Sequence, residues 1–181
     1  MTGANGVEGV AVGTVGVATP QFRRAVGRFA TGVCVVSTVV DGLDHAITVN
    51  SFSSVSLEPA LVLVCIADLA RFHDAVLASG QWAVSVLAET ARPVADWLAT
   101  PGRPVHGQLA SVPHRRGAHT GAALVSDASA WLECRTSAVH AAGDHSILVG
   151  EVLSVELAED ADAPLLYHRG AYRRLAVRGH A

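Results

Sequence analysis

Small hydrogen-bonding side chains are concentrated in one short segment, HAITVNSFSSVSLEP, which covers residues 45–59. The apolar runs VCVVSTVV and ALVLVCIA precede and follow the polar part. Hydroxyls beside free backbone N–H groups at a strand end can bind a ligand that carries ring carbonyls, ring nitrogens and phosphates. The alternative is a polar turn whose hydroxyls bond their own backbone, and composition leaves both interpretations open. The polar residues are Thr48, Asn50, Ser51, Ser53, Ser54 and Ser56.

The segment DLARFHDA, residues 68–75, comes directly after the second apolar run. A helix that starts there presents free N–H groups and the positive end of its dipole, with Arg71 in the first turn. This arrangement favours a phosphate site. An ordinary solvated arginine is the alternative.

The segment GDHSI, residues 143–147, places His145 at the start of a strand, directly after a tight turn. A histidine there can donate or accept a proton near neutral pH, and its flat ring can stack on a heterocycle. The alternative is an exposed turn histidine without a role in chemistry.

Other chemistries lack their motifs. The nine histidines include no His-x-His pair and the three cysteines no Cys-x₂-Cys pair, so no metal site is predicted. The chain has neither Gly-x-Ser-x-Gly nor Gly-x-Gly-x-x-Gly, so neither a serine nucleophile elbow nor a Rossmann dinucleotide site is supported. All thirteen basic residues are arginine, which excludes lysine-based Schiff-base and P-loop chemistry.

Size and charge narrow the class of protein. The 181 residues suit one domain, half of them are hydrophobic, and no apolar run is long enough to span a bilayer. The net charge of −3 predicts binding neither to nucleic acid nor to a membrane. Residues 1–18 contain no Arg or Lys, which predicts a flexible tail, no signal peptide and a cytoplasmic protein. Cys34, Cys65 and Cys134 lie in apolar runs, which indicates buried thiols.

The elements that must position these residues are mostly strands. Hairpins dominate, and strands do not alternate regularly with helices, which favours an antiparallel barrel with peripheral helices over a doubly wound parallel sheet. Residues 100–121 are predicted to form a long loop. We expect strands over 33–40, 45–50, 82–87, 131–142 and 145–157, one within 55–67 that ends at Ala67, and two short ones within 164–175. We expect a helix from Thr19 that Gly32 ends, with Phe22, Val26 and Phe29 on its apolar face. Two further helices are expected, one from Asp68 to Gly80 with Phe72, Val76 and Leu77 inward and one over 89–99.

Six segments occur in a fixed order along the chain: FRRAVGRFATGVCVVSTVVDG, ITVNSFSSVSLEPALVLVCIA, WAVSVL, WLECR, GDHSILVGEV and PLLYHRGAYRRL. In this order they resemble the flavin reductase family, the reductase components of two-component flavin-dependent monooxygenases. The resemblance covers about residues 20–175. It implies a mainly β fold with peripheral α, the FMN-binding antiparallel split β-barrel, over residues 19–181.

The resemblance also implies an activity. Such a protein transfers hydride from NADH to free FAD or FMN, and the reduced flavin passes to a separate monooxygenase. It implies a homodimer with flavin sites near the subunit interface. A flavin carrier or sensor without turnover is the alternative, and the GDH and YHRGAY segments favour the reductase.

The resemblance implies the site residues one by one. His145 would contact the nicotinamide of NADH and position it, which makes it the expected catalytic residue. Flavin contacts would come from the TVNS segment, from the strand end at 65–67 and from the turn that follows, and the YHRGAY segment would flank the same pocket. The implied cofactor-binding residues are Thr48, Val49, Asn50, Ser51, Ser54, Cys65, Ile66, Ala67, Arg71, Phe72, His145, Tyr167, Arg169, Gly170 and Tyr172.

The chain departs from the family pattern at the phosphate turn. Many members have Ser-x-Thr where this chain has Ala70, Arg71 and Phe72. Two hydroxyls are thus lost, and a phosphate there would depend on Arg71 and on backbone N–H groups. The choice between FAD and FMN stays open.

Overall fold

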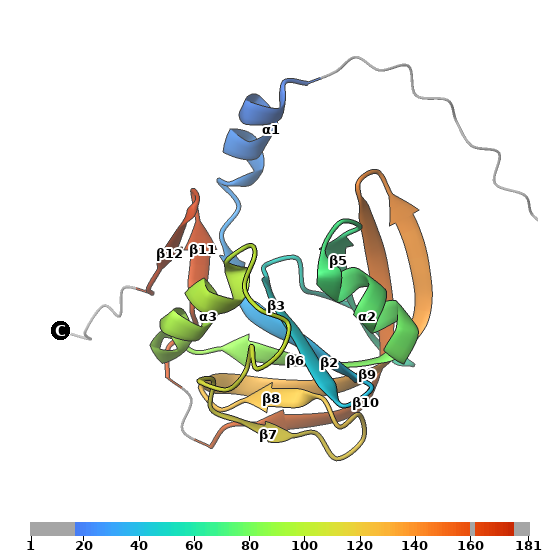
Figure 1. Ribbon diagram of the computed structural model, residues 1–181. Coiled ribbons are helices and arrows are strands. Elements are labelled where there is room, and N and C mark those ends of the chain that lie inside the picture. Colours follow the sequence, from blue (N-terminus) through green and yellow to red (C-terminus); the bar gives the residue numbers. More distant parts are fainter. Residues whose placement is uncertain (1–16, 160–161, 176–181) are drawn as a thin grey trace, which may run out of the picture.

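The protein is built on one antiparallel seven-stranded sheet with the strand order β3-β2-β6-β9-β10-β5-β4 (Figure 1). The computed structural model describes residues 17–159 and 162–175. The expected mainly β fold is confirmed. The strands of the sheet are β2 (Cys34–Val40), β3 (Leu43–Val49), β4 (Ser53–Leu57), β5 (Ala60–Ala67), β6 (Gln81–Leu87), β9 (Ala128–Ala142) and β10 (His145–Leu157).

The topology explains why the sheet curls into a split barrel. Strands β3 and β4 lie at opposite edges of the sheet order, yet only residues 50–52 separate them in the chain. The sheet must therefore curve until its two edges come close together. Ser51 fastens this junction, because its hydroxyl oxygen lies 3.0 Å from both the backbone N and the backbone O of Cys65 in β5. The barrel is split where the polar TVNS segment lies.

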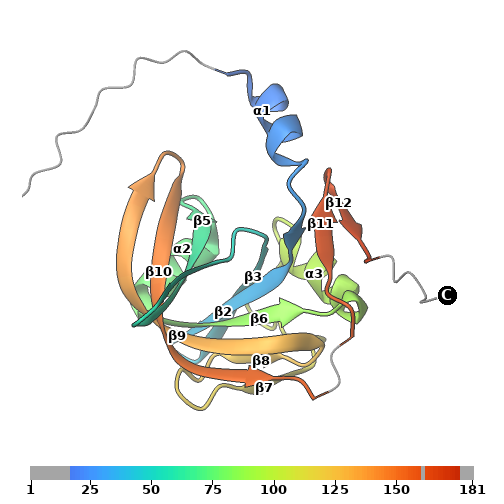
Figure 2. The same cartoon turned by 180° about the vertical axis from the view of Figure 1, so that it is seen from behind.

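Strand β2 is buried on both faces, because a separate core cluster packs against each face. Val35 belongs to a core cluster with Leu98 and Trp131, whereas Val36 belongs to a second cluster with Trp82. Figure 2 shows β6 running alongside β9, with β2 on its other side as the strand order requires. Burial raises the pKa of the Cys34 thiol to about 12, and burial and then Glu133 raise that of Cys134 to about 12.

Two helices pack on the barrel, and two small sheets complete the fold. Helix α2 (Arg71–Ser79) follows β5, and α3 (Arg92–Ala99) follows the 3₁₀ turn η1 (Glu89–Ala91). Strand β1 (Thr31–Gly32) joins β11 (Leu166–His168) and β12 (Ala171–Arg173). The segment expected as a loop over 100–121 contains β7 (His114–Arg116), which pairs with β8 (Ala123–Val125).

Three expectations for residues 55–80 were wrong. Helix α2 begins at Arg71 and not at Asp68, because the Asp68 carboxylate accepts a hydrogen bond from Ser146 while Ala70 occupies the cap in an extended conformation. Leu77 is 42% exposed rather than inward. The segment 55–67 was expected to hold one strand ending at Ala67; β5 ends there, but the segment also holds the end of β4, which pairs with β5.

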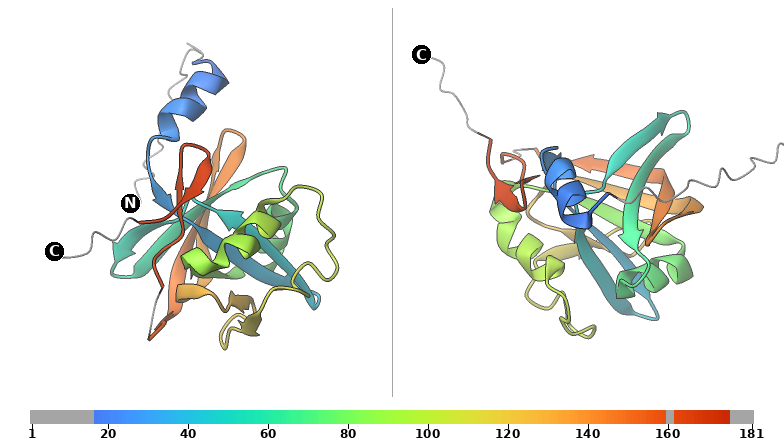
Figure 3. Two further views of the ribbon diagram at one scale, coloured as in Figure 1. Left: turned by 90° about the vertical axis from the view of Figure 1, so that its left-hand side faces the viewer. Right: turned by 90° about the horizontal axis from the view of Figure 1, so that it is seen from above.

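Helix α1 (Thr19–Val26) extends away from the barrel (Figure 3). It ends before Gly27 and not at Gly32 as expected, because the Gly27 N–H closes the last turn on the carbonyl of Arg23, and none of its residues is buried. Its expected apolar residues are found exposed: Phe22 at 56%, Val26 at 50% and, just beyond the helix, Phe29 at 76%. An apolar helix face that residues 17–159 and 162–175 leave uncovered favours contact with another molecule.

Most of the tail expected over residues 1–18 lies outside the described residues; only Val17 and Ala18 are described. No helix within 17–159 and 162–175 has the length and apolar character that a bilayer span requires.

Candidate functional site

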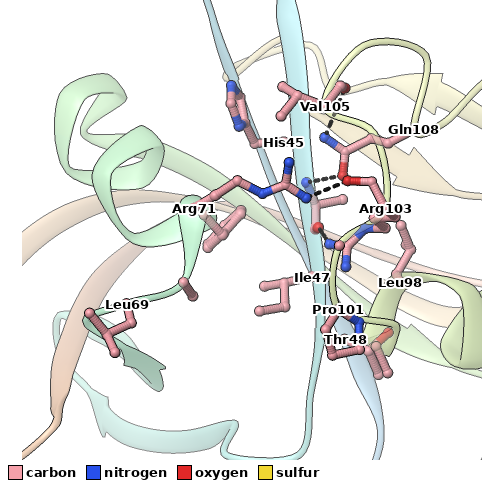
Figure 4. Close-up of a pocket in the computed structure, with 15 residues that line it drawn as sticks. His45, Ile47, Thr48, Leu69, Arg71, Leu98, Pro101, Arg103, Val105 and Gln108 are labelled. Carbon is pink, nitrogen blue, oxygen red and sulfur yellow. Dashed lines mark hydrogen bonds between the residues drawn. The ribbon is translucent and has the colours of Figure 1, made fainter.

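Two cavities adjoin at the split of the barrel, and both are lined by Thr48 and Ala99. The larger one, about 350 Å³, lies between the first turn of α2, strand β3 and the segment that follows α3. The smaller one, about 210 Å³, lies between β3 and the β11–β12 hairpin. Figure 4 shows side chains from these separate segments pointing into the larger cavity.

The larger cavity is cationic. Arg71 crosses it and donates a hydrogen bond to the backbone carbonyl of Arg103, and Arg103 donates to the carbonyls of Ala46 and Thr100 (Figure 4). No Asp or Glu belongs to the residues that line this cavity, whereas His45 does. The Nε atom of Arg103 is buried and makes no hydrogen bond within the described chain. A buried donor without a partner beside a second arginine suits an anionic ligand.

The pKa values of Arg103 and His45 are lowered by the same two causes, burial and the nearby charge of Arg71. Burial, and then the charge of Arg71, lowers the pKa of Arg103 below its ordinary value. Burial also lowers the pKa of His45; Asp44 opposes this shift and Arg71 adds to it. The positive charges of Arg103 and His45 are therefore both disfavoured in this cavity. An anion bound there would relieve the repulsion between Arg71 and Arg103.

Gln108 holds the segment after α3 against strand β3. Its side-chain amide donates to the carbonyl of Asp44, and its side-chain oxygen accepts from the backbone N of Ala46 at 3.3 Å. The indole N–H of Trp97 donates to the backbone carbonyl of Gln108 at 2.7 Å. These bonds fix the wall of the cavity that carries Arg103.

The smaller cavity has an aromatic wall. Tyr167 and Tyr172 meet edge to face with ring centroids 5.6 Å apart, and the guanidinium of Arg92 lies 5.9 Å from the Tyr172 ring centre. Burial, then Asp96 and Tyr167, raise the pKa of Tyr172, so its hydroxyl stays protonated near neutral pH. The turn of this hairpin, Arg169 and Gly170, has φ values of 52° and 75°.

The hydroxyls of the TVNS segment are partly used within the protein. The Thr48 hydroxyl donates to the carbonyl of Ala95 at 2.9 Å, and the Asn50 amide donates to the Thr31 hydroxyl at 3.2 Å. Ser51 bonds the backbone of β5 as described above. These three side chains bond other elements and not their own backbone, so the polar-turn interpretation does not describe them. Thr48, Val49 and Asn50 line a cavity, as the ligand interpretation requires.

The structure brings together some of the predicted site residues and leaves others apart. Arg71 and Phe72 line the larger cavity, and Tyr167 and Tyr172 line the smaller one. The Ile66 side chain is 1% exposed in the core, which leaves only its backbone for a ligand. The predicted residues that line neither cavity are Ser51, Ser54, Cys65, Ile66, Ala67, His145, Arg169 and Gly170.

His145 lies at the first position of β10, directly opposite Ala67 of β5 in the ladder. Its Nδ1 is 2.7 Å from the carboxylate of Asp144, and this hydrogen bond lowers the pKa of Asp144. The ring is therefore oriented by its neighbour at the tip of the β9–β10 hairpin.

Sequence reasoning missed Arg103, Gln108 and His45. The only signal for the first two was the Gly-, Pro-, Arg- and His-rich composition of residues 100–121. His45 is the first residue of the polar segment, but the pattern of polar and apolar residues along β3 did not indicate that it faces a cavity.

Comparison with known proteins decides the family. Residues 26–176 match the family described as "Flavin reductase like domain". The chain belongs to this flavin reductase family. The expected membership is thus confirmed over most of the chain.

Individual relatives support this family assignment. It is 40% identical to the NADH-dependent FMN reductase AsuE2 of Streptomyces nodosus subsp. asukaensis over 86% of this chain and 84% of that protein. It is 39% identical to a probable flavin reductase of Rhizobium meliloti over 88% of this chain, but it spans only 50% of that protein.

Solved structures show the same fold. BorF, the flavin reductase component of a bacterial two-component tryptophan halogenase, has a TM-score of 0.83 and 42% identity, covering 89% of this chain and 100% of BorF. The Streptomyces globisporus NADH:FAD oxidoreductase SgcE6, solved with NAD and FAD fragments, has a TM-score of 0.83 and 35% identity, covering 89% of this chain and 94% of SgcE6. The split-barrel prediction is confirmed by these neighbours.

Proposed function

We propose that the protein is an NADH-dependent flavin reductase that reduces free FAD or FMN. The observation that carries the proposal is the cationic cavity joined to an aromatic one at the TVNS segment, in a family whose members include named NADH-dependent FMN and FAD reductases. A flavin bound there accepts hydride from NADH when the two rings stack at the correct distance.

The residues present fit a flavin. Arg71 and Arg103 would bind its phosphate, in place of the hydroxyls that the chain lacks at positions 70–72. Thr48, Val49, Asn50 and Ser51 would follow the ring and the ribityl chain, with Ser54 near them. Further contacts would come from the strand end Cys65, Ile66 and Ala67 and from Phe72, with Tyr167, Arg169, Gly170 and Tyr172 on the opposite side.

His145 would contact the nicotinamide and hold it in place. Its Asp144 partner leaves the Nε2 side of the ring free to face a ligand. No separate nucleophile is needed for this reaction, because hydride passes directly between two bound rings.

Reduced flavin would leave and serve a partner monooxygenase. Relatives named as reductase components support this role, among them the reductase subunit HsaB of a Mycobacterium tuberculosis flavin-dependent monooxygenase, 34% identical over 83% of this chain. A flavin that must leave is bound moderately, as a substrate. We also propose a cytoplasmic location, where NADH is available.

The function is tested by following NADH oxidation with FAD, with FMN and without added flavin. We expect turnover that requires added flavin, and the two rates show which flavin is preferred. If the purified protein binds flavin but oxidises neither NADH nor NADPH, the carrier or sensor replaces the reductase.

We propose a homodimer in which α1 contributes to the interface. The double variant Phe22→Ser/Phe29→Ser should shift the protein towards monomer in light scattering coupled to size-exclusion chromatography, because it removes the exposed apolar face. Arg24→Ser changes the opposite face of the same helix and should leave the dimer intact. A monomeric wild-type protein, or an unchanged dimer in the double variant, would contradict this assignment of the interface.

A further inference from the structure

A hydrogen-bond network centred on the buried Ser146 lies beside His145, outside both cavities. The Ser146 hydroxyl donates to the Asp68 carboxylate at 2.8 Å, and His73 Nε2 lies 2.9 Å from the same hydroxyl oxygen. His73 Nε2 is also 3.5 Å from Asp68. Its Nδ1 lies 3.3 Å from the carboxylate of Asp74, which is 93% exposed.

The serine, histidine and aspartates do not form a nucleophilic triad. In a triad the serine proton points to the histidine, whereas here Ser146 donates its proton to Asp68. Ser146 is only 7% exposed and lines neither cavity. A substrate carbonyl could not reach its oxygen, so the network has a different purpose.

The donors and acceptors show which way the hydrogen bonds run. Because the one proton of Ser146 is directed to Asp68, its oxygen can only accept from His73, so Nε2 must carry hydrogen. A second hydrogen on Nδ1 would be needed to donate to the ionised Asp74. His73 therefore acts as a donor that joins helix α2 to strand β10.

The network connects the two halves of the proposed site. His73 and Asp68 flank residues 69–72, which line the larger cavity, and Ser146 directly follows His145. The backbone N of Asp68 also donates to the carbonyl of Asp144 at 3.1 Å. The start of α2 and the start of β10 are thus held together by one side-chain bridge and one backbone bond.

We infer that His73 is a positioning residue for His145, acting through Ser146 and Asp68. This inference rests on the proposed reductase function. The bridge fixes the first residues of β10 against the cavity wall, and the His145 ring then meets the nicotinamide in one orientation. Without the bridge, the tip of the hairpin would gain freedom at the residue that contacts NADH.

The test uses the full chain with His73→Leu, His73→Gln and Ser146→Ala, with the exposed His119→Gln as control. We expect His73→Leu and Ser146→Ala to lower kcat/KM for NADH about tenfold, less than the hundredfold that a 1 Å misplacement can cost. Glutamine can still donate to Ser146, so His73→Gln should stay within about threefold of wild type. If His73 served only as a surface residue of α2, leucine and glutamine at this position would have the same effect on kcat/KM.

A double-variant cycle shows whether the effect passes through His145. In a His145→Ala background, His73→Leu should lower kcat/KM for NADH by less than about twofold, because the group that it positions is gone. Additive losses would overturn the inference, as would wild-type values in both His73→Leu and Ser146→Ala.

A measurement without flavin separates this inference from the proposed function. The His145 Cε1–H signal in the NMR spectrum, assigned by its loss in His145→Ala, should shift in His73→Leu and Ser146→Ala but not in His119→Gln. If the wild-type protein does not oxidise NADH, the proposed reductase function is wrong, and the NMR signal alone then tests whether His73 positions His145. An unchanged His145 signal in both variants would overturn the bridge even if the reductase turns over.

Discussion

Replacing Arg103 with glutamine is expected to weaken FMN binding by about tenfold to a hundredfold, the equivalent of the 1.5–3 kcal/mol that a hydrogen bond to a charged group contributes. Binding of riboflavin, which lacks the phosphate, is expected to stay within about twofold of wild type. The difference between the two ligands is the decisive quantity, because it isolates the phosphate from the ring.

The physical reason lies in how Arg103 is held. Its guanidinium bonds to the carbonyls of Ala46 and Thr100, and its Nε is buried without a partner in the described chain. Burial, and then the charge of Arg71, the second arginine of the cavity, lowers the pKa of Arg103. Because no carboxylate lines the cavity, the charges of Arg71 and Arg103 are available to bind an anion.

The measurement is quenching of flavin fluorescence on titration with protein, for FMN and riboflavin in parallel. The control is Arg135→Gln, which removes an exposed arginine paired with Glu151 on the β9–β10 hairpin. Equal losses for FMN and riboflavin would mean that Arg103 supports the wall of the cavity and does not meet the phosphate. Unchanged affinity for both would remove Arg103 from the site.

The contrast between Arg71 and Arg103 shows how far the sequence alone could lead. Arg71 was predicted because it falls in the first turn of a helix expected directly after a strand, a local pattern with a physical meaning. Arg103 is 32 positions further along the chain and bonds to Ala46, 57 positions away. Such contacts depend on how the loop folds back, and no local periodicity encodes that path.

The strands show the same division between local and distant information. The hairpin of β2 and β3 was predictable from Asp41 and Gly42, which have φ values of 50° and 76° as such a tight turn requires. The start of α2 was not, because Asp68 has a partner in Ser146, 78 positions away. The Asp68 side chain, which the local pattern assigned to the helix cap, instead accepts a hydrogen bond from a residue distant in the sequence.

A second large effect is expected in the core, where Gly150→Ala should destabilise the protein. The change should lower the free energy of unfolding by about 1–3 kcal/mol, the usual cost of overpacking. For a chain of this size this corresponds to a fall in Tm of roughly 2–12 °C. Thermal unfolding followed by circular dichroism measures it.

The cause is the approach of Trp82 to the backbone of β10. A Cβ on Gly150 would meet the Trp82 ring, with Cε2 at 3.1 Å, and the Cβ of Cys134, also at 3.1 Å. Trp82 is fully buried, and its indole N–H donates to the Thr136 hydroxyl at 3.1 Å, so the ring cannot easily move. A register shift between Val149 and Gly150 marks the same place in the ladder.

Gly32→Ala is the matched control, because a Cβ there would meet nothing within 4 Å. Its stability should stay within about 0.5 kcal/mol of wild type, as for most surface substitutions. Trp82 shares its core cluster with Phe72 and Val76 of α2, so a displaced ring would also move the helix that carries Arg71. Gly150→Ala should therefore weaken flavin binding as well as lower Tm, and an unchanged Tm would mean that the core around Trp82 has room to adapt.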